Sequence, residues 1–111
     1  MILVHTTIPL DASREDELLE HIDALVEHSR NEDGTVRYRA LRDLTDPSLI
    51  RFVEQYEDAD SAKAHTESDV YRRFVETLPD VVESEIETVQ YEIDDATVAE
   101  FTAEDAVAAL D

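Results

Sequence analysis

Apolar and polar residues alternate in four stretches of the chain, and this period of two predicts β-strands. Each stretch is rich in β-branched or aromatic residues, which suit a pleated and half-buried surface. The strands are expected over residues 1–8, 35–44, 50–56 and 83–93. Because the polar turn 45–48 contains Asp, Pro and Ser, the second and third strands should form a hairpin.

The first helix is expected between the first two strands. Ser13 should open it, and Asp16 three residues later makes an acidic variant of the capping box. Apolar residues then fall on one stripe at helical spacing: Leu18, Leu19, Ile22, Leu25 and Val26. The chain's only glycine, Gly34, follows where the helix must turn into the next strand, and it should adopt a positive φ.

Two shorter helices are expected after the hairpin. Asp58 or Asp60 should cap the first of them, which breaks near Glu67. Ser68 begins the next helix, whose apolar stripe is Tyr71, Phe74, Val75 and Leu78. Pro79 should end this helix, because proline removes a backbone donor.

The order of these elements, β-α-β-β-α-β, predicts a ferredoxin-like α+β domain over residues 1–93. Helices would cover one face of an antiparallel sheet and leave the other face open. Because several strands carry apolar residues on both faces, we expect a homodimer that packs sheet on sheet. Residues 94–111 form a tail with a short amphipathic helix capped by Thr102 and Asp105, which needs a surface and could cross the dimer as an arm.

Composition excludes several classes of function. With 29 acidic residues against 9 basic ones and a net charge of −20, the chain is a poor partner for nucleic acid. The even scatter of the acids favours a protein adapted to high salt. The absence of cysteine excludes disulfides and thiolate chemistry, and a single glycine excludes glycine-rich nucleotide-binding loops. No stretch resembles a signal peptide or a membrane span, so we expect a cytoplasmic protein.

Two sets of side chains have both a structural and a functional interpretation. His21 and His28 lie seven residues apart on the first helix. Their backbones are about 10 Å apart, too far for one ion, so no metal site is expected. Four arginines gather on the hairpin: Arg37, Arg39, Arg42 and Arg51. Pairing with acidic residues of neighbouring strands is the simpler interpretation, and a patch for an anionic substrate or partner is the other.

A resemblance to a known family is carried by two stretches, GTVRYRALRD and FVEQYEDADSAKAHTESDVYRRF. In the second, a strand ending in Glu and an aromatic residue runs into a helix with His, followed by Ser and an aromatic residue. Together with the early strand and long helix, these stretches make the chain similar to the antibiotic biosynthesis monooxygenase (ABM) family of dimeric α/β-barrel proteins. The resemblance covers residues 1–93 and leaves out the tail.

This resemblance implies oxygenation of a small quinol or phenol, often without a metal or flavin cofactor. A base deprotonates the substrate, and the anion passes an electron to dioxygen inside an apolar pocket. His65 would be that base, and the rings of Tyr38, Tyr56 and Tyr71 would bind the substrate; no cofactor is expected. Alternatively, His65 only satisfies a backbone group or Glu54, the tyrosines are core residues, and the chain is a non-enzymatic ligand-binding or stress-response dimer.

One branch of the same superfamily degrades haem with an Asn, a Trp and a haem-ligating His. This chain contains no Trp. Tyr56 falls where that Trp would be, and Val75 falls where that His would be. We therefore do not expect haem degradation.

Overall fold

The computed structural model describes residues 1–110, which form four strands, four α-helices and one short 3-10 helix. The strands are β1 (Ile2–Pro9), β2 (Thr35–Arg42), β3 (Leu49–Tyr56) and β4 (Glu87–Glu92). The helices are α1 (Glu15–Arg30), α2 (Ala59–Thr66), α3 (Asp69–Val81) and α4 (Ala103–Ala108), and the 3-10 helix η1 (Ala12–Arg14) precedes α1. The expected order is therefore present, with α2 and α3 together in the second helical place.

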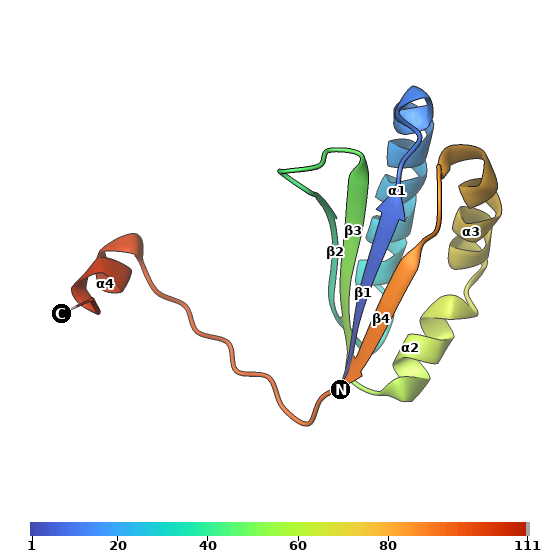
Figure 1. Cartoon of the computed structure of the whole chain (residues 1–111). Helices are drawn as coiled ribbons and strands as arrows, with labels where there is room; N and C mark the ends of the chain where they lie inside the picture. Colours follow the sequence, from blue (N-terminus) through green and yellow to red (C-terminus); the bar gives the residue numbers. More distant parts are fainter. Residues whose placement is uncertain (111) are drawn as a thin grey trace.

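The strands form one antiparallel sheet in the order β2-β3-β1-β4. The central strand β1 is hydrogen-bonded to both β3 and β4. Figure 1 shows α1, α2 and α3 on one side of this sheet, whereas the opposite side is uncovered. The predicted ferredoxin-like α+β fold is thereby confirmed.

The core lies between the sheet and helices α1 and α3. Every second residue of β1 and β3 points to the helix side, so Ile8, Ile50 and Phe52 are almost fully buried. They pack with Phe74 and Val81 of α3 and with the predicted stripe of α1. The intervening residues of each strand face away from the helices and make the open face of the sheet.

The start of α1 differs from the sequence-based prediction, whereas the starts of α2 and α3 agree with it. Ser13 does not cap α1, which has no side-chain cap; instead Asp11 caps the 3-10 helix η1, because its carboxylate accepts the backbone N–H and the hydroxyl of Ser13 at 3.0 and 2.7 Å. A short 3-10 turn follows, so α1 begins only at Glu15. Asp58 caps α2 and Ser68 caps α3, as expected.

The end of α3 and the start of β4 also differ from the prediction. Pro79 does not end α3 but lies inside its last turn, and the helix continues to Val81. The proline removes one intrahelical donor, but the Val82 N–H still donates to the Leu78 carbonyl at 3.0 Å. The last strand is shorter than the predicted 83–93, because residues 83–86 join no ladder and β4 begins only at Glu87.

Gly34 adopts a φ of 80°, as predicted for the chain's only glycine. Its carbonyl accepts the Glu57 N–H at 2.8 Å, which ties the turn before β2 to the end of β3. A β-carbon at position 34 would lie 2.6 Å from the Cβ of Ser61 in α2. The turn after α1 therefore packs directly against the first turns of α2.

After β4 the chain leaves the sheet, and α4 stands apart from the other helices (Figure 1). The radius of gyration is 16.2 Å, whereas about 13 Å is usual for a compact domain of this length. Thr102 and Asp105 form the capping box at the start of α4, as predicted. Neither α4 nor any other helix of residues 1–110 is long and apolar enough to cross a bilayer.

Replacing Gly34 with alanine should lower the free energy of unfolding by about 2 kcal/mol, because it strains both φ and the contact with Ser61. Denaturant unfolding in high salt measures the change. The control is Ser84→Ala at an exposed bend, which should stay within about 0.5 kcal/mol of wild type. Equal stability of the two variants would show that position 34 does not require glycine.

Candidate active site

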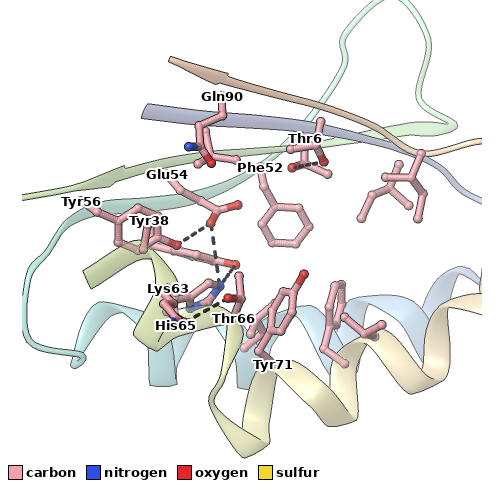
Figure 2. A pocket seen from close by; sticks show the side chains of 18 of the residues that line it. Thr6, Tyr38, Phe52, Glu54, Tyr56, Lys63, His65, Thr66, Tyr71 and Gln90 are labelled. Atoms are coloured by element: carbon pink, nitrogen blue, oxygen red, sulfur yellow. Dashed lines mark hydrogen bonds and ion pairs between the residues drawn. The ribbon is translucent and has the colours of Figure 1, made fainter. Parts of the chain in front are cut away.

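A cavity of about 520 Å³ lies between the sheet and helices α2 and α3. In Figure 2 the strands lie above this space and the helices below it. Most of the wall is apolar: Val4, Ile8, Leu25, Phe52, Phe74, Val75, Leu78 and Ile86. Polar groups also line it, among them Thr6, Glu54, Thr88 and Gln90 from the sheet and His65 and Tyr71 from the helices. Such a composition is usual for a small-molecule site.

His65, near the end of α2, is only 2% exposed. Its Nδ1 atom lies 2.7 Å from Glu32 Oε1. Because a carboxylate oxygen can only accept, Nδ1–H donates to Glu32, and Nε2 is the nitrogen whose lone pair can accept a proton. Nε2 lies 3.4 Å from the Tyr38 hydroxyl and 3.8 Å from Glu54 Oε1. The ring is thus oriented by Glu32 and directs its basic nitrogen toward Tyr38 and Glu54.

Glu32 is the residue of this site that sequence analysis misses. It lies in the turn between α1 and β2, 33 residues before His65. No spacing rule links positions so far apart, and Glu32 is one of 29 acidic residues. The only local sign is His28, whose Nε2 lies 3.9 Å from the second oxygen of Glu32. Ser29 of α1, which is fully buried, places its hydroxyl 3.4 Å from His65 Nδ1.

Glu54 and Tyr56 are neighbours on the cavity side of β3. The Tyr56 hydroxyl donates to Glu54 Oε1 at 2.5 Å. Burial raises the pKa of Glu54, and the hydrogen bond from Tyr56 and the nearby His65 oppose this rise. Burial and the negative charge of Glu54 raise the pKa of Tyr56, so its hydroxyl stays protonated near neutral pH and acts as a donor.

Tyr38 and Tyr71 complete a ring of aromatic groups around His65. The ring centroids of Tyr38 and Tyr71 each lie 5.1 Å from that of the imidazole, and the centroid of Tyr56 lies 5.6 Å away. Burial, and then the charge of Glu54, raise the pKa of Tyr38 and Tyr71. Figure 2 shows the Tyr71 hydroxyl pointing into the cavity. All four residues selected from the sequence therefore lie at one site, together with Glu54.

These groups can accept, hold and return a proton beside an apolar chamber. His65 is the candidate acceptor, Glu32 fixes its tautomer, and the tyrosine hydroxyls are donors for a ligand oxygen. Glu32 and Glu54 lie against opposite nitrogens of His65, so they do not converge on one point. Within residues 1–110, no group of three His, Asp or Glu side chains is arranged to hold a metal ion.

A profile of the antibiotic biosynthesis monooxygenase (ABM) family matches residues 1–77, which is more than half of the chain. The chain belongs to the ABM family. The ABM match runs from β1 into α3, so it includes His65, Glu32, Glu54 and the three tyrosines around the imidazole. The strand β4 and the tail that follows it lie outside the matched residues.

Individual proteins are similar to this chain over most of its length. The "Putative monooxygenase YcnE" of Bacillus subtilis (strain 168) is 24% identical over 93 residues, which are 84% of this chain and 98% of that protein. A solved "putative antibiotic biosynthesis monooxygenase" from Deinococcus radiodurans has a TM-score of 0.82 at 20% identity, covering 91% of this chain and 100% of that chain. A solved conserved protein from Methanosarcina mazei Go1 has a TM-score of 0.80 at 22% identity, and the match covers 84% of this chain and 92% of that chain. At these identities the two structures show the shared fold.

Replacing Glu54 with glutamine should change how stability depends on pH. Burial raises the pKa of Glu54 above its ordinary value of 4.5, so above that pH the folded protein holds a proton that the unfolded chain releases. The free energy of unfolding of the wild type therefore falls as the pH rises from 4.5 to the raised pKa of Glu54. The Glu54→Gln variant has no carboxyl group at this position, so it does not show this fall. The free energy of unfolding of Glu54→Gln minus that of wild type should rise above pH 4.5 and then level off.

Denaturant unfolding at constant high salt over this pH range measures the difference. Glu76→Gln, on the exposed side of α3, is the matched control for loss of one acidic side chain. A Glu54→Gln difference that stays constant with pH would contradict the destabilising burial of this carboxyl group.

Proposed function

We propose that this ABM protein is a monooxygenase that oxygenates a small quinol or phenol-like aromatic compound with dioxygen. One observation carries the proposal: a buried His65 is held by Glu32 at 2.7 Å beside a largely apolar cavity. In the proposed reaction His65 takes the phenolic proton, and Tyr38, Tyr56 and Tyr71 bind and orient the ring. Membership of the ABM family and a relative named as a monooxygenase support the same class of chemistry.

The proposed reaction requires only the substrate, dioxygen and a proton acceptor. Removal of the phenolic proton gives an anion that transfers one electron to dioxygen, and the two radicals combine to form a C–O bond. The O–O bond then breaks, leaving one oxygen on the ring carbon as a quinone carbonyl. The other oxygen leaves as water with the phenolic hydrogen and the hydrogen of the attacked carbon. The ring supplies all the electrons, and the apolar walls keep water from the anion.

The cavity has polar groups at two separate places, which favours a substrate with two oxygens. Glu54 and His65 stand at one place, and at the other the hydroxyls of Thr6 and Thr88 are hydrogen-bonded at 3.0 Å. Thr6 pairs with Phe52, two residues along β3 from Glu54, so the two places are about 7 Å apart along the sheet. Figure 2 shows the Phe52 ring between them. A para-dihydroxy ring would place one oxygen at each end.

A ligand-binding protein without catalysis is the second candidate function. The partners of His65 favour it, because both ring nitrogens already face protein groups: Glu32 at Nδ1 and Tyr38 at Nε2. A histidine with two such partners can serve only to hold the cavity in shape. In that case the protein would bind the same aromatic compounds without consuming oxygen.

We also propose that the chain forms a homodimer through the open face of the sheet. Leu3, Val53 and Val89 are half-buried on this face, and Leu41 and Tyr91 are 46% and 48% exposed. Stacking two such faces about a two-fold axis would remove these side chains from water. The cavity lies on the other side of each sheet, so each subunit would keep its own site.

Oxygen uptake with a panel of hydroquinones and phenols, in high salt, tests the proposed chemistry. His65→Gln should lower kcat by about 100-fold or more, since it removes the proton acceptor. Glu32→Gln keeps an acceptor oxygen for Nδ1–H but loses the charge that stabilises the protonated ring, so kcat should fall by about tenfold. The exposed Glu76→Gln is the control and should match wild type.

Near-UV circular dichroism of each variant reports whether the packing around the site survives. Oxygen uptake by folded His65→Gln at the wild-type rate would remove His65 from the mechanism. Tight binding of the same compounds without oxygen uptake by the wild-type protein would support the second candidate function.

Replacing both Thr6 and Thr88 with valine should raise KM by roughly 30-fold with little change in kcat. The valines keep the shape of the cavity, but the far oxygen of the substrate loses its partners, at about 1 kcal/mol for each hydrogen bond. Steady-state oxygen uptake with a para-hydroquinone measures this effect, and a phenol with one oxygen should show little change. Thr97→Val, exposed and beyond the sheet, is the matched control. An equal rise in KM for both substrates would contradict the two-ended arrangement.

A further inference from the structure

Arg37 and Arg39 lie exposed on the open face of the sheet. They alternate along β2 with Tyr38, which is buried on the helix side, so their side chains face away from the helices. Both are exposed, and within residues 1–110 neither makes an ion pair or a side-chain hydrogen bond, whereas the other seven of the nine cations do. Pairing within the hairpin, expected from the sequence, holds for Arg51 with Asp43 at 2.9 Å but is wrong for Arg37 and Arg39.

Residues 94–110, here called the C-terminal arm, have the opposite charge and uncovered apolar side chains. The arm contains five acidic residues and no basic one. Its large apolar side chains are 62% to 83% exposed: Val98, Phe101, Val107 and Leu110. Ala103 and Val107 are four residues apart and lie on one side of α4, and Leu110 follows in the turn after the helix. A helix this short is stabilised mainly by whatever covers its apolar side.

The arm leaves the sheet on the side where a second subunit would stand. Figure 1 shows it running from β4 away from the sheet, on the side opposite to α2 and α3. It begins at β4, the edge of its own sheet farthest from β2. Two subunits stacked on their open faces would each send an arm toward the other. Residues 94–102, extended, span about 30 Å, which exceeds the width of a four-stranded sheet, about 15 Å.

We propose that the C-terminal arm of each subunit docks on the open-face side of β2 in a second copy of this chain. Acidic residues of the arm would meet the partner subunit's Arg37 and the partner subunit's Arg39, and Phe101 and Val107 would cover the partner subunit's Leu41 on the same edge strand, beside the stacked sheets. Opposite charges set the position of the arm. Apolar burial supplies most of the attraction at high salt, where exposed ion pairs are screened. The inference rests on the proposed dimer and is independent of the proposed chemistry.

Disulfide trapping tests the contact directly, because the chain has no cysteine of its own. Arg39→Cys and Val107→Cys chains are co-expressed and oxidised, and linked peptides are identified by mass spectrometry. We expect a disulfide between positions 39 and 107, which in this mixture can join only different chains. Arg72→Cys on the exposed surface of α3 replaces Arg39→Cys in the control, and it should link to position 107 about tenfold less.

Three outcomes would overturn the proposal. A bond between positions 39 and 107 formed only within single chains carrying both changes would place the arm on its own sheet. No such bond, in a protein that is dimeric by sedimentation, would leave the dimer without the arm contact. A protein that sediments as a monomer would contradict both the proposed dimer and the docking of the arm. Oxygen uptake by the same variants tests the chemistry separately, because the changed residues do not line the cavity.

Charge reversal in the full chain gives a second test. At moderate salt, Arg37→Glu with Arg39→Glu should weaken the dimer by about tenfold in Kd, measured by sedimentation. Adding Glu100→Arg and Glu104→Arg should restore it. Arg72→Glu with Arg73→Glu makes the same change in net charge on α3 and should have a smaller effect. Equal weakening by both reversals, without rescue, would contradict docking on β2.

Discussion

The hydrogen bond between His65 and Glu32 connects parts of the molecule that the sheet alone does not join. Glu32 lies in the turn after α1 and His65 in α2, and 2.7 Å separates their bonded atoms. A buried imidazole needs partners for its nitrogens, and here they come from this turn, from Tyr38 on β2 and from Glu54 on β3. The same contacts therefore place α2 on the sheet and decide which ring nitrogen can accept a proton.

Negative charge has different consequences outside and inside this fold. On the surface, many acidic side chains are solvated, and salt screens their mutual repulsion. Inside, Glu54 is shielded from water, and its charge helps to keep the hydroxyls of Tyr38, Tyr56 and Tyr71 protonated. The cavity thus combines several hydrogen-bond donors with one histidine.

Much of the fold could be predicted from the sequence, because alternation along the strands is a local signal. The same alternation places Tyr38 and Tyr56 on the helix side of the sheet with His65 opposite, so their convergence could be expected too. Glu32 could not, since its partnership depends on how a turn meets a helix 33 residues away. Two predicted helix boundaries were wrong because local hydrogen bonds competed with the predicted ones. At the start of the first helix, Ser13 donates its backbone N–H to Asp11. At the end of α3, the Val82 N–H donates to the Leu78 carbonyl across Pro79.

Gly34 has a consequence beyond the geometry of its turn. Because it has no side chain, the segment that carries Glu32 can lie against Ser61 at the start of α2. The residue that lets the backbone reverse is therefore also the one that lets the carboxylate approach the imidazole. A side chain at this position would disturb both the turn and the pairing of Glu32 with His65, since both depend on the same close approach to Ser61. Related chains with a larger residue here would need a smaller one at position 61 or a repositioned α2.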